Sequence, residues 1–178
     1  MHEDLLHFWF HDIRPRQWWA VDPAFDALIR QRFEATLHAA ERGELHAWRR
    51  TPRGRLAEII VLDQFSRNAY RGTARAFAND PMALVLAQEA VAGGHDQVLD
   101  ATQRAFLYMP YMHSESLLVH EQAMRLFAAP GLEGNYDFEL RHKAIIERFG
   151  RYPHRNAALG RESTVEEQAF LRQPGSQF

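Results

Sequence analysis

Two short segments place an arginine directly before an asparagine, just after an aromatic residue and ahead of a glycine. The first segment carries Arg67, Asn68 and Arg71, and the second carries Arg155 and Asn156. A guanidinium group suits carboxylate and phosphate oxygens because its N–H groups form a planar fork. The partial repeat indicates duplicated helical pairs, which would bring the two segments to related positions. We therefore predict a polar pocket for a small anionic molecule or an acidic peptide.

Asp63 belongs to the same predicted site. It shares a helix face with apolar residues such as Ile59, and it lies four residues before Arg67. A carboxylate on this apolar stripe would therefore meet the guanidinium group one turn later. Two interpretations stay open. Either the pair is an internal ion pair that orders the helix end, or Arg67, Asn68 and Arg71 face a ligand.

The second segment allows the same two interpretations. Arg148, Arg151, His154 and Arg155 gather at the C-terminal end of a predicted helix. Cations at such an end satisfy free carbonyl groups and the helix dipole. This group of cations is larger than one helix end requires, which favours a binding site. The predicted ligand-binding residues are Asp63, Arg67, Asn68, Arg71, Arg155 and Asn156.

Histidine and glutamate side chains indicate an alternative, an enzyme with acid–base groups in the same pocket. The candidate catalytic residues are His113, Glu115 and His154, acting in a hydrolase or a lyase. His142 falls on the apolar face of its predicted helix, so we expect it to be at least half buried. The spacing of the histidines matches no metal motif, so we predict no metal and no cofactor.

The composition excludes several classes of function. The 178-residue chain has no cysteine, so disulfides and cysteine nucleophiles are excluded. A formal net charge of -2 creates no basic field for nucleic acid, and no apolar run approaches the length of a membrane span. Glycine-rich phosphate loops are missing as well. We expect a soluble, cytoplasmic protein with no nucleic-acid and no membrane partner, and its oligomeric state stays open.

Helix start and stop signals recur along the chain, whereas strand signals are nearly missing. We expect Pro110 to break one helix, Ser114 to cap the next, and Tyr136 to begin another. The expected helices lie between residues 3 and 10, 22 and 43, 51 and 65, 80 and 93, 100 and 108, 114 and 127, and 136 and 149, with a short one after 164. The fold is therefore predicted to be all-α, one domain over residues 1–178 with about eight antiparallel helices. Residues 170–178 would form a loose tail unless Phe178 docks.

Further motifs follow one another nearly end to end: Phe8-Trp9-Phe10, Asp22-Pro23-Ala24-Phe25-Asp26, Leu62-Asp63-Gln64-Phe65-Ser66-Arg67-Asn68, Tyr70-Arg71-Gly72-Thr73-Ala74, Tyr108-Met109-Pro110-Tyr111-Met112-His113-Ser114-Glu115, Phe149-Gly150-Arg151-Tyr152-Pro153-His154-Arg155-Asn156 and Pro174-Gly175-Ser176. In this order they resemble a bacterial family catalogued as domain of unknown function 924. The resemblance implies an all-α fold similar to tetratricopeptide-repeat proteins, and it brings no known reaction. Ser66, where the family usually has Pro, and His11, where Gly is expected, are departures that concern local backbone geometry.

Three classes of function follow from these patterns. The repeated arginine–asparagine segments favour a helical binding module for a small anionic molecule or an acidic peptide. The histidines and Glu115 support the enzyme as an alternative. A scaffold that binds other proteins through its surface is supported by the implied fold alone.

Overall fold

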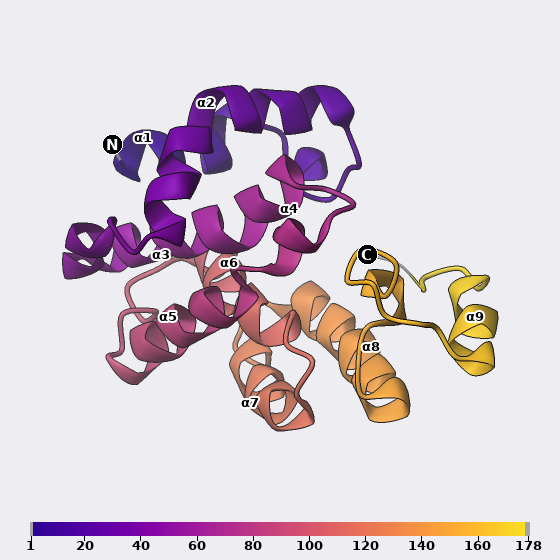
Figure 1. Cartoon of the computed structure of the whole chain (residues 1–178). Coiled ribbons are helices and arrows are strands. Elements are labelled where there is room, and N and C mark those ends of the chain that lie inside the picture. Colours follow the sequence, from indigo (N-terminus) through magenta and orange to yellow (C-terminus); the bar gives the residue numbers. More distant parts are fainter. Residues whose placement is uncertain (1, 177–178) are drawn as a thin grey trace.

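The computed structural model describes residues 2–176 and confirms the all-α prediction (Figure 1). Within these residues no β-strand occurs. The helical elements, with η1 and η4 as π-helical turns and the other η elements as 3-10 turns, are α1 (His2–His7), η1 (Phe8–Asp12), η2 (Pro15–Trp18), α2 (Pro23–Glu41), η3 (His46–Arg50), α3 (Pro52–Ile60), η4 (Val61–Phe65), α4 (Ser66–Ala69), η5 (Ala74–Phe77), α5 (Asp80–Ala92), α6 (Ala101–Met112), α7 (Leu117–Phe127), α8 (Glu133–Phe149), η6 (Pro153–Arg155) and α9 (Val165–Leu171).

The predicted capping signals begin and end several helices as expected. The Asp22 carboxylate accepts the backbone N–H of Ala24 at 2.9 Å ahead of α2. Thr51 caps α3 in the same way, with its hydroxyl oxygen 3.1 Å from the Gly54 nitrogen. At the other end of α8, Gly150 adopts a left-handed conformation with φ of 69°, which a glycine reaches without a Cβ clash.

The centre of the molecule is one nearly continuous helical segment formed by α3, η4 and α4. Its residues from Leu56 to Ser66 are all buried, in agreement with the apolar sequence. Phe65 packs against the rings of Phe33 and Trp9, with centroid distances of 4.8 and 5.4 Å. Figure 1 shows α1 and α2 on one side of this segment and α5, α7 and α8 on the other. No helix among residues 2–176 is both long and apolar enough to cross a membrane.

Three predicted helix boundaries were wrong. Pro110 does not end its helix, because α6 continues to Met112 and burial of its last two turns offsets the hydrogen bond that proline cannot donate. Ser114 does not cap the next helix, which begins at Leu117. Instead, its hydroxyl accepts the Ser116 N–H at 3.2 Å within a loop. Helix α8 begins at Glu133, one turn before the predicted start.

The C-terminal segment packs as a small separate layer on α8. Phe170 of α9 lies against Phe149, with ring centroids 5.1 Å apart. Ser176 is buried, and its hydroxyl donates to the carbonyl oxygen of Leu171 at 3.1 Å. The predicted tail comprised residues 170–178. Its last two residues lie outside the described part of the chain, and so does any docking of Phe178.

We expect Phe65→Ala to lower the free energy of unfolding by about 3–5 kcal/mol, because it removes a fully buried ring and leaves a cavity. Val85→Ala is the matched control: this α5 side chain is 55% exposed, so the change should stay within about 0.5 kcal/mol. Urea unfolding followed by circular dichroism measures both values. Equal effects of the two substitutions would contradict a core centred on Phe65.

Candidate functional site

Arg67 and Arg155, one from each predicted segment, meet at the carboxylate of Asp80. Arg67 forms a planar fork, with Nη1 2.8 Å from Oδ1 and Nη2 3.0 Å from Oδ2. Arg155 donates from Nη1 to Oδ2 of the same carboxylate at 3.2 Å. The side chains are 19% and 7% exposed for Arg67 and Arg155, respectively. Two largely desolvated cations therefore share one anion.

We call Arg67 and Arg155 the arginine pair. Three separate elements position these two residues and Asp80. Arg67 lies on α4, directly after the π-helical turn η4. Asp80 is the first residue of α5, and Arg155 ends η6, behind Pro153. Since Arg155 and Asp80 are 75 residues apart in the chain, tertiary packing alone brings them together.

Asp63 lies beneath the arginine pair and links it to His113. Its Oδ1 is 3.1 Å from Arg67 Nη1 and 2.7 Å from His113 Nδ1, while Gln64 donates to Oδ2 at 2.6 Å. Burial alone would raise the pKa of Asp63. The charge of Arg67 and the contact with His113 outweigh burial and hold this pKa below its ordinary value. Asp63 is therefore an ionised, buried carboxylate at neutral pH.

His113 is fixed from two sides. Its ring nitrogen Nδ1 binds Asp63, and its backbone carbonyl accepts Arg155 Nη2 at 3.0 Å. Burial, followed by the nearby charge of Arg67, lowers the pKa of His113 although Asp63 acts in the opposite direction. The imidazole is therefore neutral at pH 7.

Aromatic rings cover the guanidinium of Arg155. Its central carbon lies 4.7 Å from the Phe77 ring centroid and 4.6 Å from that of Tyr152, so both rings pack against the guanidinium group. Nε of Arg155 is buried and has no hydrogen-bond partner among residues 2–176. Burial and the neighbouring charge of Arg67 lower the pKa of Arg155. Of the two arginines, Arg155 has the less complete set of partners.

The other predicted ligand-binding residues do not join the arginine pair. Asn68 and Arg71 both bind the carboxylate of Asp26, with Arg71 Nε at 2.6 Å and Asn68 Nδ2 at 2.8 Å. Asn156 accepts Arg161 Nε at 2.9 Å and donates to the Ser163 hydroxyl at 3.0 Å. The two asparagines therefore hold the backbone corners in place.

Glu115 and His154, two of the candidate catalytic residues, have different surroundings from His113. Glu115 accepts Arg161 Nη1 at 2.7 Å and the Tyr152 N–H at 2.7 Å. Burial would raise the pKa of Glu115, but Arg161 and the Tyr152 N–H lower it. Burial, and after it the charge of Arg155, lowers the pKa of His154 to about 3. His142 is buried, as predicted, and its pKa is lowered to about 3 by burial.

Asp80, Phe77 and the buried pair of His120 and Glu139 were not predicted from the sequence. Asp80 precedes a proline at the start of a helix, and helix initiation alone accounts for an aspartate at this position. His120 Nδ1 lies 2.6 Å from Glu139 Oε1, and both side chains are fully buried. A histidine on the apolar stripe of a helix was the available signal for this pair, since His120 lies about one turn before the buried Ala123 and two turns before the buried Phe127.

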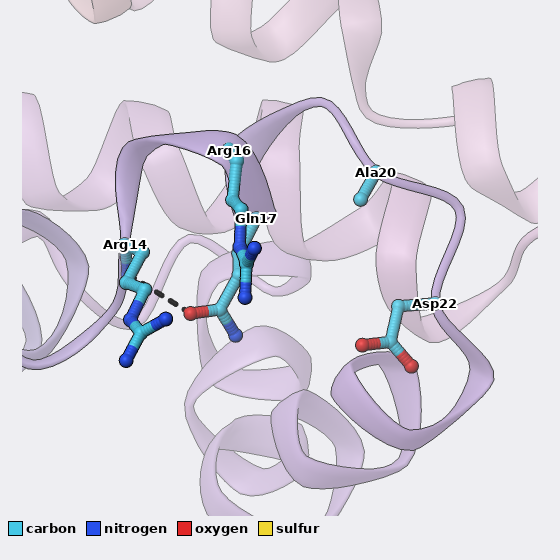
Figure 2. Close-up of a pocket in the computed structure, with 5 residues that line it drawn as sticks. All are labelled: Arg14, Arg16, Gln17, Ala20 and Asp22. Carbon is cyan, nitrogen blue, oxygen red and sulfur yellow. Dashed lines mark hydrogen bonds between the residues drawn. The ribbon is translucent and has the colours of Figure 1, made fainter.

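Two surface hollows lie elsewhere. The larger, of about 520 Å³, is lined by Arg14, Arg16, Gln17, Ala20 and Asp22. Figure 2 shows its arginine and glutamine side chains on one side and Asp22 on the other. The smaller, of about 290 Å³, lies at the junction of α7 and α8. Neither is lined by a residue of the arginine pair. In the described part of the chain, no group of three or more histidine and acidic side chains is arranged to hold a metal ion.

The family model described as "Bacterial protein of unknown function (DUF924)" matches residues 5–175. The chain belongs to the DUF924 family. A solved structure of a protein of unknown function from Agrobacterium tumefaciens, ATU0120, is 39% identical, with a TM-score of 0.91 and 96% of each chain covered. No curated protein matches the chain. The all-α fold of this DUF924 chain and its resemblance to the family are thus both confirmed.

The buried histidines predict how the stability of this DUF924 protein depends on pH. Unfolded histidine binds a proton near pH 6.5, whereas His142 and His154 stay neutral in the folded chain down to about pH 3. Between these values the unfolded state binds more protons, so the free energy of unfolding falls as pH decreases. The expected slope is about 1.4 kcal/mol per pH unit for each histidine.

Urea unfolding between pH 7 and about pH 5, above the range in which carboxylates titrate, measures this slope. His142→Gln should reduce it, because the variant loses one group that the unfolded state protonates. His46→Gln, on the exposed surface, serves as the control and should retain the slope of the unmodified chain. An unchanged slope in His142→Gln would contradict a neutral, buried His142.

Proposed function

We propose that this protein is a helical binding module whose arginine pair takes the carboxylate of a small anionic molecule or of an acidic peptide. The observation that carries the proposal is the convergence of two largely buried guanidinium groups on one carboxylate. Arginine forks recognise planar carboxylates through two parallel N–H···O bonds. Asp80 occupies the position that the ligand carboxylate would take.

The balance of charge favours an incoming anion at Arg155. Arg67 has two carboxylate neighbours, Asp63 and Asp80, at 3.1 and 2.8 Å. Arg155 has only the longer contact to Asp80 and a neutral carbonyl partner, and its Nε has no partner within residues 2–176. Because a desolvated cation with incomplete partners is costly, a ligand carboxylate that replaced Asp80 and bound Arg155 more closely would be stabilised.

The rings of Phe77 and Tyr152 support a planar ligand group. They lie against the guanidinium of Arg155, so a ligand group that binds in the plane of the guanidinium would avoid both rings. A carboxylate can lie in that plane, whereas a phosphate group carries further oxygens out of the plane. The site therefore favours a carboxylate over a phosphate.

The same contacts also join α4, α5 and η6, so binding must be measured separately from stability. We expect acetate to shift NMR amide signals around Arg155 and Asp80, relative to chloride at equal ionic strength. Arg155→Gln should weaken acetate binding about tenfold, because it removes a charged hydrogen-bond donor. Arg125→Gln, on the exposed face of α7, is the matched control.

Asp80→Asn should have the opposite effect. It removes the internal carboxylate that competes for the arginine pair, so acetate should bind about tenfold more tightly. A purely structural ion-pair network makes a different prediction: both Arg155→Gln and Asp80→Asn would lower stability, and acetate would shift no signal near the pair in any variant. That result would overturn the proposed binding function.

A further inference from the structure

His113 differs from the other carboxylate-bound histidine in the core, His120. In His120, both ring nitrogens have partners: Nδ1 lies 2.6 Å from Glu139 and Nε2 lies 2.9 Å from the Ser114 carbonyl oxygen. In His113, Nδ1 binds Asp63, but no hydrogen bond reaches Nε2 within the described part of the chain. The His113 side chain is 16% exposed, whereas His120 is fully buried. His113 therefore has an available ring nitrogen.

The proton positions on His113 follow from its partner. Asp63 is ionised, so its oxygens can only accept hydrogen bonds, and His113 Nδ1 must donate. The neutral imidazole then carries its lone pair on Nε2. A carboxylate that holds Nδ1–H in this way orients the ring and stabilises the imidazolium formed when Nε2 takes a proton. Asp63 is thus a positioning residue for a base.

His113 is also part of the arginine pair's surroundings. Its carbonyl accepts Arg155 Nη2, and the Asp63 oxygen that holds its ring is 3.1 Å from Arg67 Nη1. The charges of Arg67 and Asp80 both act on the pKa of the His113 imidazole, so a ligand carboxylate in the place of Asp80 would lie near this ring. A proton-transfer site needs a substrate held in place and a base oriented toward it. Here the two arginines would hold the ligand carboxylate, and Asp63 orients the His113 imidazole.

We propose that His113 Nε2 is a catalytic base that removes a proton from the atom next to the carboxylate of a substrate held by Arg67 and Arg155. In this step the new N–H bond forms at Nε2 and the C–H or O–H bond of the substrate breaks. Its electron pair stays on the substrate, and Asp63 balances the charge of the imidazolium. The inference rests on the proposed carboxylate binding and adds a reaction class to it.

Alkylation by iodoacetate tests the arrangement without a known substrate. The reagent carries a carboxylate for the arginine pair and a carbon that Nε2 can attack: the N–C bond forms, the C–I bond breaks and iodide leaves. Neutral iodoacetamide is the matched reagent. Because the chain has no cysteine, thiols do not compete. The exposed His46 is a reference inside the same molecule, and peptide mass spectrometry reports labelling at each histidine.

The expected result is a rate ratio, iodoacetate over iodoacetamide, about tenfold higher at His113 than at His46. Arg155→Gln should remove this preference, and acetate should protect His113. Asp63→Asn should slow labelling of His113 by neutral iodoacetamide and leave labelling of His46 unchanged, because the amide no longer stabilises the imidazolium cation; a merely structural role of Asp63 does not predict this difference. Asp80→Ala, which removes the carboxylate shared by both guanidinium groups, should accelerate labelling of His113 by iodoacetate.

The proposed role of His113 as a base would be wrong if the ratio of iodoacetate to iodoacetamide labelling rates were equal at His113 and His46, both in the unmodified chain and in Asp80→Ala. If acetate still shifts the NMR signals around Arg155 in that case, the binding function stands and only the role of His113 fails. If acetate shifts no signal and His113 shows no preference, the binding function and the proposed base both fail.

Discussion

The ion pairs of the Asp80 carboxylate with Arg67 and Arg155 are the interaction on which the arrangement of α4, α5 and η6 depends. Without it, Arg67 and Arg155 would be neighbouring cations in a poorly solvated space, which is strongly unfavourable. With it, the start of α5 is tied both to α4 and to η6, 75 residues further along. In the proposed binding function, a ligand would have to supply an anion of similar shape in place of Asp80, because the two cations would otherwise lack a counter-charge.

The π-helical turn η4 gives the site its second layer. In this turn the chain from Val61 to Phe65 is fully buried, yet it carries an ionised carboxylate at Asp63. Burial of that charge is tolerated because Arg67, His113 and Gln64 all contact it. Such turns often occur at functional sites, since a wider helical turn redirects side chains. Asp63 thereby holds a cation and a histidine at once.

Much of the fold was predictable, because caps such as Asp22 and Thr51 act within one helical turn. Pairing over long distances was not. The sequence marked Arg67 and Arg155, but it could not show that Asp80 joins them, since an aspartate before a proline is fully explained by helix initiation. Asn68 and Asn156 looked equivalent in the sequence. Tertiary packing distinguishes them, because it places Asp26 beside Asn68 and Arg161 beside Asn156. The tetratricopeptide-like superhelix remains a prediction.

Two imidazole–carboxylate contacts inside the molecule have different environments. His120 with Glu139 and His113 with Asp63 are both imidazole–carboxylate contacts, at 2.6 and 2.7 Å. The first is closed off from solvent and has a partner on each nitrogen, so it stabilises the packing of α7 on α8. The second lies at the edge of the arginine pair with one nitrogen available. Access and neighbouring charge, rather than residue type, therefore separate the structural pair from the one proposed to act on a ligand.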